Sequence, residues 1–112
     1  MDELNAVFHA LANDHRRQII HELAIRPRSI SELAAHRGLS LPAIHKHLRT
    51  LEEADMIRRH KTGRTTVIAL RRAPLRRLQA WVDQFHPYWG SDSEALDNYA
   101  DHFDNHSPQP KE

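Results

Sequence analysis

The sequence contains no cysteine, which excludes disulfide bonds and thiolate metal sites. No stretch approaches the run of about 18 apolar residues that a membrane-spanning helix needs. The start, Met1-Asp2-Glu3, lacks the basic residues of a signal peptide. There is also no Gly-rich phosphate loop, nucleophile elbow or His-Glu-x-x-His motif. We therefore expect a soluble, cytoplasmic protein that is not an enzyme.

Acidic residues are scarce in most of the chain and concentrated at its end. Residues 1–81 hold 15 of the 16 lysines and arginines but eight of the 15 acids, a net charge of +7. Residues 82–112 hold one lysine and seven acids, a net charge of −6. A basic body with an acidic tail is typical of a protein that binds a polyanion on one face.

The segment 40–51 predicts a helix that is apolar on one side and basic on the other. Its apolar residues recur at spacings of three and four, which places them on one stripe. They are Leu41, Ile44, Leu48 and Leu51. Ser40 can cap the first turn, and a proline at position 42 loses only an amide without an intrahelical partner. The other face has no carboxylate before residue 52, which suggests an anionic partner rather than an ordinary solvated face.

A shorter helix is expected just before this one. Ser29 and Glu32 form a capping box that starts it, and Gly38 suits the left-handed position that ends it near Arg37. A short helix, a Gly-containing turn and a second amphipathic helix are the sequence form of a helix-turn-helix, whose second helix enters the major groove of DNA. The alternative is two helices of an unspecialised bundle. Two further helices are expected upstream, one with apolar residues from Leu4 onward that ends near Ala12, and one from Asp14 to about Ile25.

Beyond residue 54 the pattern changes to that of a β-hairpin. Segments 56–60 and 65–70 are β-prone and are joined by Lys61-Thr62-Gly63-Arg64. A basic hairpin beside a helix-turn-helix is a wing, which can reach phosphates or the minor groove. The predicted fold is therefore mainly α with a small β-hairpin, a winged helix-turn-helix. The expected DNA-binding residues are Ser40, Pro42, Ala43, His45, Lys46, His47, Arg49, Lys61, Arg64 and Thr65.

Large apolar residues outside this core predict a homodimer. Pro74 opens a helix whose stripe runs to Phe85, with Pro87 ending it, and its aromatics exceed what one small domain needs. Packing of the terminal helices within one chain is the alternative. The expected interface residues are Val7, Phe8, Leu11, Leu78, Trp81, Phe85 and Trp89. An acidic amphipathic helix is expected to follow a second capping box at residues 91–94. Residues 1–104 are expected to form one domain, and residues 105–112 a disordered tail.

Zinc is the one cofactor that the histidines make conceivable, and we expect none to be required. Asp83 and His86 lie one turn apart on the expected dimer helix, and His102 lies in the acidic segment. Carboxylates and imidazoles suit Zn²⁺ chemically. The pair is nonetheless a common surface arrangement, so a zinc-responsive protein is the lesser alternative.

Several of these motifs together resemble the ArsR-type winged-helix transcriptional repressors. Residues 8–20 and 30–34 resemble the opening of that family, residues 40–51 its recognition helix, and Gly63-Arg64 its wing turn. The resemblance covers about residues 5–90. It implies a homodimeric repressor of a palindromic double-stranded DNA operator, with terminal helices in the interface and an effector, often a metal ion, that weakens DNA binding.

The sequence departs from that family in two places. The Cys-x-Cys motif of metal-sensing members is absent, and His45 stands where members usually have Ser. The ending from Trp81 to Trp89 resembles a metal-independent branch. We therefore expect a transcriptional regulator without cysteine-based metal sensing, and the sequence identifies no small-molecule effector. The further alternative is a winged-helix module that binds protein.

Overall fold

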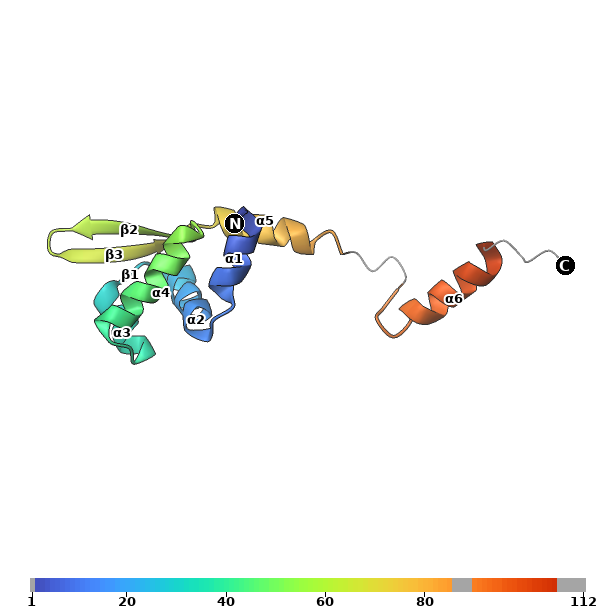
Figure 1. Cartoon of the computed structure of the whole chain (residues 1–112), viewed down its shortest axis with the longest axis horizontal. Helices are drawn as coiled ribbons and strands as arrows, with labels where there is room; N and C mark the ends of the chain where they lie inside the picture. Colours follow the sequence, from blue (N-terminus) through green and yellow to red (C-terminus); the bar gives the residue numbers. More distant parts are fainter. Residues whose placement is uncertain (1, 86–89, 107–112) are drawn as a thin grey trace. The chain divides into compact units, whose positions relative to one another are not determined.

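The computed structural model describes residues 2–85 and 90–106, and it divides the chain into two compact units, residues 1–81 and 82–112. Each unit is considered by itself. The first contains the helices α1–α4, a small sheet and nearly all of α5, and the second contains α6 (Figure 1). The expectation of one domain over residues 1–104 stays a prediction.

Two helices open the first unit, as the sequence predicts. Helix α1 spans Glu3–Leu11, and α2 spans Asp14–Ile25. Asp2 caps α1 by accepting from the backbone amide of Asn5 at 2.7 Å, and Asn13 caps α2 by accepting from the amide of Arg16 at 3.2 Å. These caps satisfy amides that the first helical turn leaves without partners, so each helix starts at a defined residue.

The helix-turn-helix consists of α3 over Ile30–Arg37 and α4 over Leu41–Glu53. Both bonds of the predicted capping box at the start of α3 are present, between Ser29 and Glu32. Gly38 ends α3 with a φ of 64°, a left-handed conformation that favours glycine. Ser40 then accepts from the amide of Ala43 and caps α4. The sequence reading of this motif is confirmed.

The wing is a hairpin of β2, Ile57–Thr62, and β3, Thr65–Leu70. The ladder continues to the pair Thr62–Thr65, so only Gly63 and Arg64 form the turn, and Gly63 has a φ of 61°. A third strand, β1 at Arg28–Ser29, pairs with β3 in the antiparallel order β1-β3-β2. This strand was not predicted, because it has only two residues, the second of which is the cap of α3, and so carries no alternation.

The core joins all of these elements. Its buried apolar residues come from the four helices, both long strands and the segment between α4 and β2: Val7, Ala10, Ile19, Ile20, Leu23, Leu33, Ala34, Ile44, Leu48, Leu51, Ala54, Met56, Ile57 and Ile68. The assignment of Val7 to the dimer interface is wrong, because its side chain is completely buried in the core of its own chain. On α1, Leu11 lies at the edge of the core and Phe8 lies outside it.

Helix α5 spans Ala73–Val82 and is shorter than the sequence suggests. Pro74 is buried in its first turn, and Leu75 and Leu78 pack against the core. The predicted continuation to Phe85 is wrong: that residue follows the end of the helix and is 66% exposed. The predicted end at Pro87 and the residues His86 and Trp89 lie outside the described residues.

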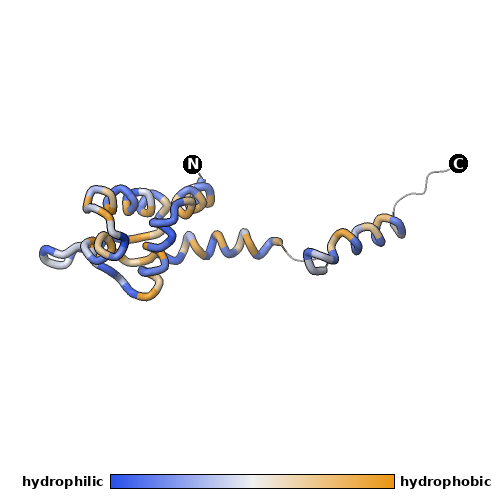
Figure 2. The backbone as a smooth tube through the Cα atoms, turned by 90° about the horizontal axis from the view of Figure 1, so that it is seen from below, coloured by the Kyte–Doolittle hydropathy of each residue, from blue (hydrophilic) through white to orange (hydrophobic). Residues whose placement is uncertain are grey.

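The second unit contains helix α6, Ala95–His106. Hydrophobic residues recur along α5 and α6 between hydrophilic ones (Figure 2). The predicted capping box before α6 is incomplete: the Ser91 hydroxyl donates to the Glu94 carboxylate at 2.9 Å, while the Glu94 amide donates to the backbone carbonyl of Ser91. Because α6 continues to His106, it includes the first two residues of the predicted tail, and residues 107–112 lie outside the described part. No described helix is long and apolar enough to cross a membrane.

Candidate nucleic-acid interface

The buried stripe of α4 fixes which side of the helix faces outward. Ile44, Leu48 and Leu51 are completely buried, so the opposite side of α4 is turned away from the core. On that side Lys46 and Arg49 are exposed, together with Ser40 and Pro42 at the start of the helix. Ala43 is half-buried at its edge. These predicted residues therefore form a cationic surface that a groove of DNA can approach.

Leu41 is the functional candidate that the sequence analysis missed. Its spacing places it with the apolar stripe, yet its side chain is 52% exposed in the first turn of α4. Leu41 therefore offers an apolar contact beside the cationic surface.

His45 lies on the flank of α4 that faces the wing. The guanidinium of Arg59 on β2 contacts the Nδ1 of His45 at 3.5 Å and donates to the carboxylate of Glu52 at 2.7 Å. One arginine of the wing is thus held against two residues of α4. This contact fixes the hairpin relative to the recognition helix and leaves His45 half-buried between them.

His47 lies on the opposite flank, against α2, so its prediction as a residue of the outer face is wrong. Its Nδ1 is 3.3 Å from a guanidinium nitrogen of Arg16, and its ring centroid is 5.6 Å from that of His15. Burial lowers the pKa of His47, and the charges of Arg16, His15 and Lys46 lower it further. Arg16 in turn donates to the carbonyl of Ala10 at 2.7 Å. His47 therefore holds α4 against α2.

The wing and the start of α4 meet at a hollow of about 470 Å³. Leu41 and His45 of α4 line it, together with Arg64 and Thr65 of the wing. Residues at the start of α3 and Thr66 complete the lining, and none of the lining residues is a carboxylate. Lys61 is exposed on β2, two residues before the wing turn. Of the predicted residues, the structure thus brings His45 of α4 together with Arg64 and Thr65 of the wing at one hollow.

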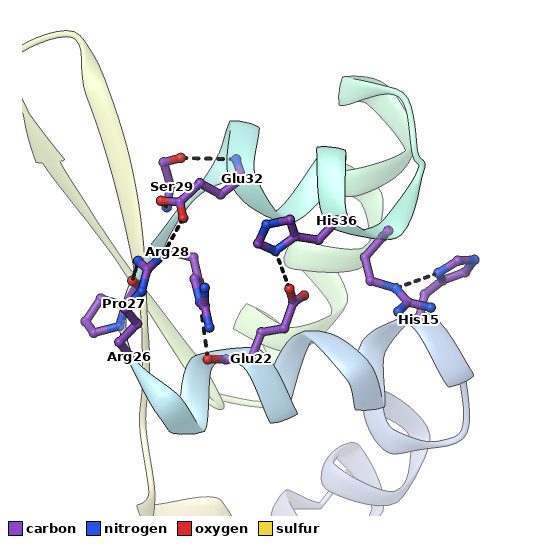
Figure 3. A network of polar contacts seen from close by, with 9 residues as sticks. His15, Glu22, Arg26, Pro27, Arg28, Ser29, Glu32 and His36 are labelled. Carbon is purple, nitrogen blue, oxygen red and sulfur yellow. Dashed lines mark hydrogen bonds and ion pairs between the residues drawn. The ribbon is translucent and has the colours of Figure 1, made fainter.

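A polar network holds α3 in place behind this surface (Figure 3). The Glu32 carboxylate accepts from Arg26 at 2.8 Å and from the backbone amide of Ser29 at 3.2 Å. The bond from Arg26 and then that from Ser29 lower the pKa of Glu32 to about 2. Between α2 and α3, the imidazole of His36 lies 2.6 Å from the Glu22 carboxylate. These contacts set the position of α3 and thereby that of the turn before α4.

The aromatic residues predicted to form a dimer interface remain accessible in the first unit. Phe8 is 40% exposed and Trp81 is 39% exposed, although the two rings contact each other. Leu11 and Leu78 are half-buried at the edge of the core. Two large aromatic side chains that their own chain covers only in part form a surface suited to a second copy.

A metal site is not formed by the residues that the structure describes. Asp83 and His102 are among them, yet no group of three or more His, Asp or Glu side chains there could hold a metal ion. His86 lies outside the described part, and the sequence has no cysteine.

Comparisons with known proteins agree with this architecture. A model of the family described as bacterial regulatory protein, arsR family, matches residues 13–59. The HTH-type transcriptional regulator Rv2034 of Mycobacterium tuberculosis is 34% identical over 91 residues, which cover 81% of this chain and 79% of that protein. The transcriptional repressor SdpR of Bacillus subtilis is 29% identical over 82 residues, 73% of this chain and 91% of that one. With two other curated relatives, the match covers 50% and 55% of the relative's own length.

A solved structure shows the same fold over most of the chain. The ArsR-like transcriptional regulator from Rhodococcus sp. RHA1 superimposes with a TM-score of 0.73 and is 29% identical, covering 89% of this chain and 92% of that one. The residues that the family model matches contain α2, β1, α3, α4 and the beginning of the wing. The chain belongs to the arsR family of bacterial regulatory proteins, DNA-binding transcriptional regulators that are not enzymes.

Proposed function

We propose that this regulator is a homodimeric repressor that binds a palindromic operator and needs no metal to be released from it. The observation that carries the proposal is the meeting of α4 and the wing at one surface whose hollow is lined without a carboxylate. The side chains around it are cationic, neutral polar or apolar, which suits phosphates and base edges together. In this arrangement α4 enters the major groove and the wing follows the backbone or the minor groove.

The two elements have different tasks in this proposal. Lys46 and Arg49 on the outward side of α4 read guanine, whose O6 and N7 accept from cationic side chains. Leu41, which is exposed at the start of α4, makes the apolar contact that a thymine methyl group offers. Lys61 and Arg64 of the wing act on phosphates, which position the protein without reading sequence. The contact of Arg59 with His45 holds α4 and the wing in a fixed relative position.

Dimerisation is supported by the surface around Phe8 and Trp81. Burying one large apolar side chain is worth about 1.5–3 kcal/mol, so a few on each subunit offset the cost of association. A two-fold dimer places one α4 in each half-site, with the half-sites about one helical turn apart. The relative named SdpR is a transcriptional repressor, and we extend that activity to this chain.

Release without metal is supported by the chemistry of the available donors. The sequence offers no thiolate, and Asp83 and His102 are the candidates that the structure describes. A zinc-responsive regulator would need His86 in addition. If zinc lowers the operator affinity strongly and His86→Ala abolishes that effect, the protein belongs with the zinc-responsive regulators instead.

The test is selection of bound duplexes from a random library, followed by footprinting on the DNA upstream of the protein's own gene. We expect enrichment of a sequence with two-fold symmetry, protected over two half-sites whose centres lie about 10 base pairs apart. Enrichment of a single asymmetric half-site would contradict the dimer. Absence of any enriched sequence would contradict sequence-specific binding.

A further inference from the structure

Four arginines surround a second hollow, at the base of the hairpin where β3 leads into α5. The hollow measures about 300 Å³ and is lined by Arg58, Arg71, Arg72 and Arg76. Small apolar residues at the end of β3 and the start of α5 complete it. No lining residue is acidic. A concentration of guanidinium groups around one hollow is the chemistry that proteins use for phosphate.

This hollow lies on the face of the sheet that is turned away from α4. Successive side chains of a strand point to opposite faces. Arg59 points to α4, where it bonds to Glu52, so Arg58 points to the other face. Arg58 is paired across the ladder with Ala69, which also lines the hollow. The arginine hollow is therefore separate from the surface that we assign to the operator.

The charges around the hollow are poorly compensated within the chain. Arg71 has a carboxylate partner, Asp55, at 3.0 Å. Within residues 2–85 and 90–106, no carboxylate lies within ion-pair distance of Arg58, Arg72 or Arg76. Their side chains are exposed, so an anion can reach them.

The start of α5 adds a further reason for an anion. Ala73, its first residue, lines the hollow, and the first turn contains no acidic residue. Because the amide end of a helix is partially positive, acidic side chains there stabilise a helix and cationic ones destabilise it. Arg72 and Arg76 place cations at that end. A bound dianion would offset both the helix dipole and the crowded guanidinium groups.

We propose that this arginine hollow binds phosphate groups, and that its ligand is a phosphorylated small molecule. The volume is at the lower end of the range of about 300–1,000 Å³ that small-ligand clefts occupy. The position away from α4 favours a free ligand over the backbone of the operator, which is the other source of phosphate. The proposal does not depend on the function proposed above, because the free-ligand site would exist without DNA.

The first arm of the test uses inorganic pyrophosphate at constant ionic strength, titrated calorimetrically into the full-length protein. Arg58→Ala and Arg76→Ala are expected to raise the dissociation constant roughly tenfold or more, as the loss of a charge-assisted hydrogen bond does. Arg17→Ala removes the same charge from an exposed site on α2 and should leave the dissociation constant for pyrophosphate unchanged. Circular dichroism verifies folding. Arg76→Ala alone should unfold at the same or a higher temperature, because it removes a cation from the amide end of α5.

The second arm of the test distinguishes a free ligand from the backbone of DNA as the source of the phosphate groups. Duplex affinity is measured against salt without pyrophosphate, and each neutralised phosphate contributes roughly 0.9 to the slope of log affinity on log salt concentration. With a free ligand, pyrophosphate binds and Arg76→Ala leaves the slope unchanged. With the DNA backbone as source, the slope of Arg76→Ala falls by roughly 0.9 for each subunit. The proposal of a phosphate site would be overturned by two results together: folded wild-type protein binds no pyrophosphate, and its duplex affinity has the same salt slope as that of Arg76→Ala. If no duplex is bound at all, the pyrophosphate arm decides alone.

Discussion

The ring of Phe8 meets the ring of Trp81 edge to face, with centroids 5.3 Å apart and planes at 81°. This contact joins α1, the first helix of the winged-helix unit, to the end of α5. Edge-to-face aromatic pairs are favourable beyond the area that they bury. Because both rings also remain about two-fifths exposed, the pair forms a preassembled apolar surface rather than a closed piece of core.

Replacement of Trp81 by alanine tests whether this surface is a dimer interface. Loss of one buried aromatic from each subunit should cost about 1.5–3 kcal/mol per side, which raises the dimer dissociation constant at least about a hundredfold. Light scattering on dilution measures the mass, and Trp81→Phe, which retains a ring, should stay largely dimeric. A folded Trp81→Ala protein with an unchanged dimer mass would contradict the assignment.

His45 and Arg64 should differ in what they do for DNA binding. His45 lies on the flank of α4 that faces the wing, so His45→Ala should change the preference among operator variants. Arg64→Ala removes a phosphate contact and should weaken binding to all variants by a similar factor. Affinities for a panel of single-base-pair variants separate these effects. The opposite pattern would mean that the outward face of α4 is wrongly assigned.

Leu41 should read a thymine through its methyl group. Replacing single thymines of the selected operator by deoxyuridine removes that methyl and nothing else. At one position in each half-site the wild-type affinity should fall, whereas Leu41→Ala, already weaker, should no longer distinguish the two bases. Equal affinity of wild type for every uracil-substituted duplex would show that Leu41 makes no such contact.

The sequence predicted the parts of this fold that depend on local rules. Ser29, Glu32, Gly38 and Ser40 occupy the cap positions expected of them, because capping needs particular residue types within three residues of one another. The strand at 28–29 was missed, since two residues reveal no periodicity and its pairing depends on β3, far along the chain.

The errors at the site have a common physical cause. Helical spacing identifies one apolar side of α4 but does not say which neighbour covers each flank. Leu41 was placed in the core because its spacing fits, and His47 was placed outside because it is polar. His47 is half-buried against the guanidinium of Arg16 from another helix, a contact that spacing alone does not reveal. The inward position of Val7 likewise depends on how α1 docks.

His47 predicts a specific loss of stability in mild acid. Its pKa is lowered from the ordinary value of 6.5, mainly by burial and then by the nearby cations. The unfolded chain therefore takes up a proton first, so the free energy of unfolding falls as the pH drops below about 6.5 towards the lowered pKa. His47→Gln can still accept from Arg16 but cannot be protonated there, so its stability should fall less between pH 8 and pH 5. Thermal unfolding at both pH values measures the difference, and equal losses in both proteins would refute it.

The salt dependence of operator binding tests the central claim, that α4 and the wing together hold duplex DNA. If the wings of a dimer each neutralise two phosphates through Lys61 and Arg64, wild-type log affinity should fall against log salt concentration with a slope steeper than about −3.5. The double variant Lys61→Ala, Arg64→Ala should lose about 3 to 4 of that slope while keeping the same preferred sequence. A flat response of the wild type, or an undiminished slope in the double variant, would contradict the account.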